Sequence, residues 1–103
     1  MTLLDLKPRW VGAGGPGITR DGQPVPERHG VGVSFDCPCG QCGIRCYVPF
    51  RNPLDGGPCH ETRYDLWERT GNSFETLTIR PSIRRMDGCG WHGWITAGYV
   101  TSV

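Results

Sequence analysis

Two cysteine-containing turns that lie far apart in the sequence constrain this chain more than any other feature. The first is the run CPCGQCG over residues 37–43, and the second is CGWH over residues 89–92. A CxxC pair combined with a CxxH pair has the spacing of a closed tetrahedral zinc site, because each turn directs two ligands at one ion. The spacing therefore predicts a fold that is stapled by a metal across the intervening sequence.

Five side chains compete for the four positions around such an ion: Cys37, Cys39, Cys42, Cys89 and His92. Cys39 and Cys42 have the spacing of a zinc knuckle. Cys37 lies two residues before Cys39, so in an extended segment the two side chains point to opposite faces unless the chain bends. We expect a structural Zn²⁺ bound by Cys39, Cys42, Cys89 and His92, with Cys37 as the alternative to Cys39. Disulfides, unligated buried thiols and an iron–sulfur cluster are the competing interpretations.

The composition favours short strands joined by loops. Hydrophobic residues make up 37% of the 103 residues, and the chain contains 16 glycines and 9 prolines. A core of this size needs a staple, and a bound metal is the one that we expect. We therefore predict a mostly β fold, in which a small antiparallel sheet carries zinc-ribbon-like knuckles and long Gly/Pro-rich loops.

Alternating patterns locate the expected strands. Residues 31–36 lead into the first cysteine turn, and residues 44–50 form the return strand, in which Cys46 is a buried small hydrophobe rather than a ligand. Further strand regions are expected at residues 74–83 and at residues 94–100, the latter as a hairpin that turns near Ala97-Gly98. One or two helical turns are expected over Tyr64 to Arg69.

We expect one domain over residues 1–103. Residues 1–30 form a loop-rich N-terminal arm with a short edge strand, and residues 31–103 form the zinc-stapled β core. The glycine-rich segment 12–30 lacks the Lys-Ser/Thr ending of a phosphate-binding loop, so we interpret it as a flexible loop.

Charge and hydropathy weigh against several classes of protein. The net charge is +1 with both signs interspersed, which gives little attraction to nucleic acid or to a membrane surface. Arg80, Arg84 and Arg85 form a local exception, which we interpret as a solvated edge. The N-terminus lacks the pattern of a signal peptide, and no run of 18 apolar residues exists. We therefore expect neither secretion nor a membrane partner, and a reducing compartment such as the cytosol.

Cys59 and His60 are the remaining candidates for chemistry. They lie next to Glu61 in a segment rich in glycine and proline, and the sequence identifies no carboxylate that would orient the histidine. We interpret them as an ordinary loop, with a Cys/His nucleophile dyad as the alternative.

Three segments of the chain resemble the DUF6527 family, a group of small uncharacterised proteins from phages and bacteria. They are the CPCG turn at residues 37–40, the segment from Leu77 to Ile83, and the segment from Cys89 to Ile95 that runs into a glycine hairpin. The resemblance covers residues 31–100. It implies a metal-binding protein encoded by a phage or a bacterium, and some bacterial relatives are similar to neighbours of ubiquitin-like conjugation genes.

A site closed by four protein ligands has no open position for a reactive water, which favours a structural zinc over a metalloenzyme. We therefore predict a phage-encoded structural-zinc β domain without catalytic residues, which acts through protein–protein contact as a virion component or a host-directed effector. Its partner would be a phage or host protein, its location the host cytoplasm or the virion, and an oligomer is left open. The alternatives are a zinc-dependent hydrolase or conjugation-associated enzyme that uses residues 59–61, and a weak nucleic-acid binder that uses the three arginines.

Overall fold

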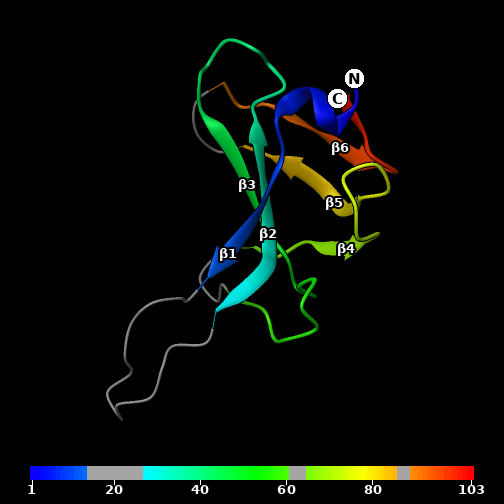
Figure 1. The fold of residues 1–103 in the computed structure, drawn as a ribbon. Coiled ribbons are helices and arrows are strands. Elements are labelled where there is room, and N and C mark those ends of the chain that lie inside the picture. Colours follow the sequence, from blue (N-terminus) through cyan, green and yellow to red (C-terminus); the bar gives the residue numbers. More distant parts are fainter. Residues whose placement is uncertain (14–26, 61–64, 86–88) are drawn as a thin grey trace.

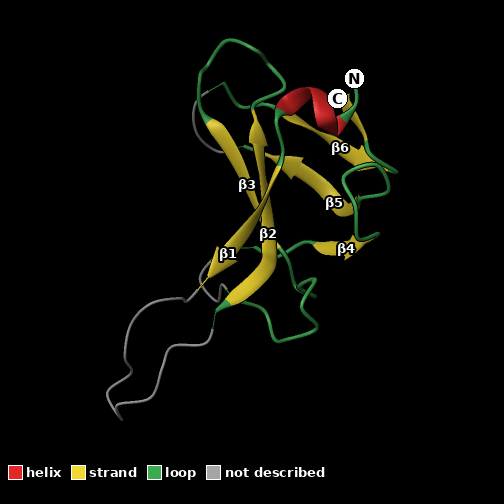
Figure 2. Cartoon of the chain, viewed as in Figure 1, coloured by secondary structure: helices red, strands yellow, loops and turns green. Residues whose placement is uncertain are grey.

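Two antiparallel sheets make up the described part of the protein, residues 1–13, 27–60, 65–85 and 89–103 of a computed structural model (Figure 1). The first sheet has the order β1 (Arg9–Ala13), β2 (Arg28–Asp36), β3 (Arg45–Pro49). The second has the order β4 (Glu68–Thr70), β5 (Thr78–Arg84), β6 (His92–Thr96), β7 (Tyr99–Ser102). The described helical structure is one short 3-10 turn, η1 (Leu3–Leu6), so the predicted mostly β class is confirmed (Figure 2).

The core lies between the two sheets, because each sheet turns one face of alternating apolar residues toward the other. Both sheets contribute buried side chains to a single cluster, which includes Val33, Phe35, Cys46, Val48, Ile79, Ile83, Ile95 and Val100. Two isolated bridges, Thr2 to Tyr99 and Phe50 to Trp67, connect the sheets at their margins. The buried position of Cys46 agrees with its predicted role as a small hydrophobe.

Of two predictions for individual segments, one is confirmed and one is wrong. The last hairpin is confirmed: Ala97 and Gly98 have φ values of 47° and 78°, the left-handed pair that a two-residue hairpin turn requires. The expected helical turns over residues 64–69 are wrong for the described residues 65–69. There the chain is extended, because the Trp67 N–H donates to the carbonyl of Pro49 and the Trp67 carbonyl accepts from Arg51. Most of the predicted glycine-rich loop lies outside the described residues.

No helix in the described ranges has the length and apolar character needed to cross a bilayer.

An irregularity in β5 positions the site described next. Ile79 pairs with Ile95 and Ile83 pairs with Gly93, so four residue steps along β5 face two along β6. The extra residues lie around Pro81, whose peptide bond with Arg80 is cis. A bulge of this kind redirects the side chains of a strand. Here it lies immediately beside Ser82.

Candidate functional site

Four cysteines converge where the ends of the two sheets meet. The Sγ atoms of Cys37, Cys39, Cys42 and Cys89 all lie within 4.8 Å of one another, and the Cys37 and Cys89 sulfurs are 3.3 Å apart. A zinc–sulfur bond length of about 2.3 Å implies sulfur–sulfur distances of about 3.8 Å around a tetrahedral ion. The four cysteines could therefore hold a metal ion with little rearrangement.

A bend in the chain allows Cys37 and Cys39 to reach the same point. β2 ends at Asp36, and the Gly40 N–H donates to the Cys37 carbonyl at 3.1 Å to close a turn. The alternation of an extended strand ends where this turn begins, so the two thiols no longer point to opposite faces. This geometry brings Cys37 and Cys39 into one cluster, although the sequence left a choice between them.

Backbone donors stabilise one of these thiols as a thiolate. The N–H groups of Gln41 and Cys42 approach the Cys39 sulfur at 3.4 and 3.3 Å, and they lower the pKa of Cys39 to about 6. In contrast, burial raises the pKa of Cys46 to about 12. Because a metal binds the thiolate form, this lowered pKa prepares Cys39 to act as a ligand, whereas burial keeps the proton on Cys46.

His92, the fourth predicted ligand, lies at the start of β6 and away from the cysteine cluster. Its Nε2 atom is 3.0 Å from the Oγ atom of Ser82 on β5. The preceding residue, Trp91, is buried against Phe35, so the next side chain along the chain faces the opposite way. The candidate ligands that the fold brings together thus include Cys37, the alternative named from the sequence, and do not include His92.

Ser82 and His92 share an outward face of the second sheet. Arg84 pairs with His92 across the ladder, which places Ser82, two residues earlier, diagonally opposite the histidine. The Trp94 ring lies 6.0 Å from the His92 ring, and the Trp67 indole N–H donates to the Ser82 carbonyl at 3.2 Å. A hydroxyl within hydrogen-bond reach of an imidazole nitrogen is the arrangement of a nucleophile and its base.

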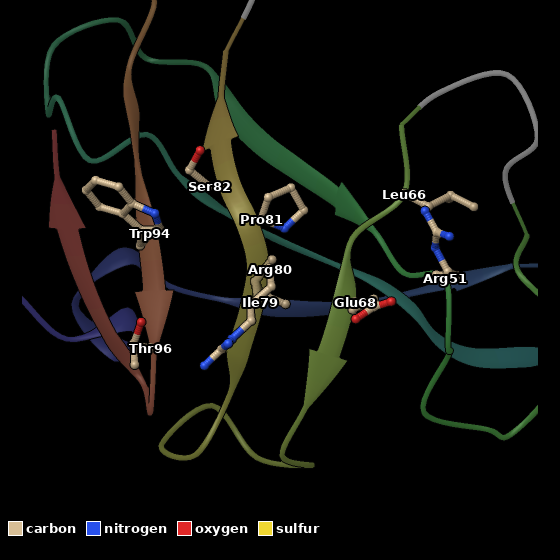
Figure 3. Close-up of a pocket in the computed structure, with 9 residues that line it drawn as sticks. All are labelled: Arg51, Leu66, Glu68, Ile79, Arg80, Pro81, Ser82, Trp94 and Thr96. Carbon is tan, nitrogen blue, oxygen red and sulfur yellow. The ribbon is translucent and has the colours of Figure 1, made fainter.

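Two surface depressions meet at Ser82. The first, of about 810 Å³, lies between Trp94 on β6 and Leu66 and Arg51 beyond β4, with Ser82 and Pro81 between them (Figure 3). The second, of about 860 Å³, continues toward β3 and the end of β5. Arg51, Leu66, Pro81 and Ser82 line both depressions. An extended chain could therefore cross the hydroxyl with contacts on each side.

The other candidates lie apart from both groups. Cys59 is half-buried and His60 is exposed in their loop, and Glu61 lies outside the described residues. Arg80 and Arg84 are exposed, as a solvated edge requires. Arg85 is not: it is 8% exposed and donates to the Ile44 carbonyl at 3.3 Å, with the Cys42 sulfur 3.5 Å away.

A comparison with known protein families bears on the Ser82–His92 pair. Residues 17–103 match the model of a family described as bacterial ubiquitination-like system serine protease (BubE). The chain belongs to the BubE family. No curated protein and no solved structure matches it.

Membership of the BubE family corrects two predictions. The resemblance to DUF6527 named the wrong family, and the phage origin inferred from it has no support. The main prediction of function, a phage-encoded structural domain acting through protein contact, is also wrong, because the family is named as a protease. The conjugation-associated enzyme, held as an alternative, agrees better with the BubE description.

Sequence reasoning missed Ser82 altogether. Among the described residues, it is the serine whose hydroxyl lies within hydrogen-bond distance of a histidine. The chain carries no recognisable nucleophile motif around it, and its histidine was assigned to the metal because Cys89 lies three residues earlier. The sequence offered one indication of the pair: Ser82 and His92 are polar residues in or next to segments that are expected to be strands.

Proposed function

We propose that this chain is a serine protease of a ubiquitination-like system, with Ser82 as the nucleophile and His92 as the general base. The observation that carries the proposal is the 3.0 Å separation between Ser82 Oγ and His92 Nε2. The description of the BubE family supports the same reaction class, and the two depressions that meet at Ser82 give a polypeptide access to it. The substrate is a protein whose amide bond, peptide or isopeptide, crosses the hydroxyl.

The reaction follows from the positions of these two groups. Ser82 Oγ attacks the carbonyl carbon while His92 Nε2 takes the hydroxyl proton, and a tetrahedral oxyanion forms. When the carbon–nitrogen bond breaks, His92 returns the proton to the leaving amine, and Ser82 holds the acyl group as an ester. A water then attacks the ester as His92 takes its proton. The ester bond breaks and Ser82 recovers its proton from His92.

Within the part of the chain that the structure describes, the proposed catalytic unit consists of Ser82 and His92. For the residues that the structure covers, no carboxylate is recorded within hydrogen-bond distance of the His92 ring. The Trp94 ring lies beside the imidazole and is tilted by 32° relative to it. The main-chain pairing of His92 with Arg84 fixes the position of the base relative to β5.

A fluorophosphonate probe, which reacts with activated serine hydroxyls, tests the proposal. We expect mass spectrometry to find the adduct on Ser82, and His92→Gln to slow the labelling by about 10²- to 10⁴-fold, the usual contribution of a general base. His29→Gln, which changes an exposed histidine on β2, serves as the matched control and leaves the labelling rate unchanged. An adduct on another residue, or labelling that requires Cys59 or His60, would refute the dyad.

We further propose that the ion at the cysteine cluster is a structural Zn²⁺ held by Cys37, Cys39, Cys42 and Cys89. Four thiolates close a tetrahedral site without an open position, which is the usual form of a structural zinc. In this position the ion ties the turn after β2 to the connection that enters β6. Elemental analysis should find one zinc per chain, and iron in its place would contradict the assignment.

A further inference from the structure

We propose that the groove around Ser82 recognises a carboxylate of its substrate through Arg84 and Arg51. The inference rests on the proposed function of Ser82 and extends it to the chemistry of the substrate. The first observation is the distribution of charge. The chain has a net charge of only +1, yet four arginines line the depression that contains Ser82.

Arg84 lies beside the reacting groups, and Arg51 lies across the groove from Ser82 (Figure 3). Arg84 is two residues after Ser82 on the same outward face of β5, and it lies directly across the ladder from His92. Arg51 lines each of the two depressions that meet at Ser82. A peptide that crosses the hydroxyl therefore passes within reach of both guanidinium groups.

The second depression has a strong excess of positive charge. Its lining contains one carboxylate, Asp65, against four arginines: Arg45, Arg51, Arg84 and Arg85. Arg45 is neutralised by Asp36 at 2.8 Å, and Arg85 is buried against the Ile44 carbonyl. The charge that remains open to a ligand is that of Arg51 and Arg84, which together exceed the single carboxylate of Asp65.

Arg51 and Arg84 are both exposed. The ion pairs recorded for the described residues are Arg28 with Asp55 and Arg45 with Asp36, and neither includes them. Arg80, the third exposed arginine of the groove, lies directly opposite Glu68 in the ladder between β4 and β5, so an anion that approaches Arg80 would also meet the negative charge of Glu68. Arg51 and Arg84 therefore offer the donors for a substrate anion.

A carboxylate fits these donors best, because a guanidinium presents a planar fork that matches the two carboxylate oxygens. The group can come from an Asp or Glu side chain near the scissile bond, or from the terminal carboxylate of a chain that ends within the groove. Both sources present the same ligand chemistry. A peptide series can separate them.

The test measures binding without turnover. Four labelled octapeptides of Ala, Gly and Ser carry either one Glu or one Gln at the centre, and end in either a free carboxylate or an amide. Their dissociation constants are measured against the Ser82→Ala protein at low salt. We expect the preferred carboxylate to bind about 3- to 10-fold tighter than its neutral counterpart, and added salt to reduce this ratio. Comparison of Glu with Gln tests a side-chain carboxylate, and comparison of the free with the amidated C-terminus tests a terminal carboxylate.

Variants assign the preference to residues. Arg84→Gln and Arg51→Gln should each bring the ratio toward one, and Arg84→Lys should retain only part of it, because the charge remains but the planar fork is lost. Arg9→Gln removes an exposed arginine from β1 of the other sheet and should leave the ratio unchanged. Equal affinity for all four peptides, or a ratio that survives both glutamine variants, would overturn the proposal.

Fluorophosphonate labelling of the wild-type protein separates this inference from the proposed function. If Ser82 is labelled and all four peptides bind equally, the carboxylate site is refuted and the protease assignment stands. If Ser82 is not labelled but binding depends on the carboxylate, the protease assignment is refuted and the groove remains a site that binds anions.

Discussion

The cysteine cluster and the Ser82–His92 pair use neighbouring residues for different purposes. Cys89 and His92 are three residues apart at the entry to β6, and Ser82 and Arg85 are three apart at the end of β5. Cys89 and Arg85 turn toward the cluster, the latter with the Cys42 sulfur at 3.5 Å, whereas Ser82 and His92 meet each other. The same two strands thus carry the candidate metal site on one side and the proposed catalytic pair on the other.

The difference between the two regions lies in how each depends on the rest of the fold. The cluster is self-contained, because four sulfurs within 4.8 Å of one another could hold one ion without a partner molecule. The serine–histidine pair is open, since Ser82 lies where two depressions meet. A closed site contributes to stability and an open site to chemistry. Changes in the two regions should therefore have separable effects.

The largest separation is expected from Ser82→Ala. Loss of the nucleophile should lower substrate cleavage by at least about 10³-fold, whereas loss of one half-buried hydrogen bond should change the free energy of unfolding by no more than about 1 kcal/mol. Ser73→Ala, which removes a hydroxyl from an exposed turn, is the matched control and retains activity. Cleavage assays and thermal melts on both variants measure the two quantities. An active Ser82→Ala protein would disprove the assignment of the nucleophile.

Cys89→Ala should have the opposite profile, with a primary effect on folding. Metal binding contributes directly to the free energy of folding, so removal of one ligand should unfold the chain or lower Tm by at least about 15 °C. Activity should fall as a consequence, because His92 lies three residues along the chain. Cys59→Ala, which changes a half-buried cysteine outside the cluster, should melt close to the wild type. A well-folded, zinc-free Cys89→Ala protein would contradict the structural role of the site.

The sequence predicted the closed region far better than the open one. Ligand spacing is a local property, so the CxxC pair and Cys89 could be identified, and alternation located the strands that carry them. The sequence could not show that Cys37 lies with the other three cysteines while His92 lies apart, because this depends on a turn after Asp36 and on the burial of Trp91. The Ser82–His92 pair depends on a strand register and a bulge that have no local signature. A dyad across two strands is set by tertiary structure alone.

Gly93→Ala tests the boundary between the two regions with an intermediate effect. A Cβ atom at Gly93 would overlap the backbone carbonyl of Thr101 and the ring of Trp91. The carbonyl belongs to the ladder between β6 and β7 and has little room to move, so we expect a loss of about 1–3 kcal/mol in the free energy of unfolding. Activity should decrease too, because the shift is transmitted to His92. Urea denaturation, with the exposed Thr96→Ala on the same strand as the control, measures the cost. Wild-type stability would show that β6 can shift without strain.

The smallest effect is expected from Cys46→Val, although Cys46 packs in the same core as Cys37. Cys46 is 4% exposed, burial raises its pKa to about 12, and valine is an apolar side chain of similar size. We expect a change of less than about 1.5 kcal/mol in the free energy of unfolding, with one metal ion still bound and the Ser82 labelling rate unchanged. Cys42→Val makes the same chemical change inside the cluster and should release the metal. Elemental analysis of the two variants shows which of the two cysteines the metal needs. Loss of the ion from Cys46→Val would identify Cys46 as a ligand and contradict its assignment to the core.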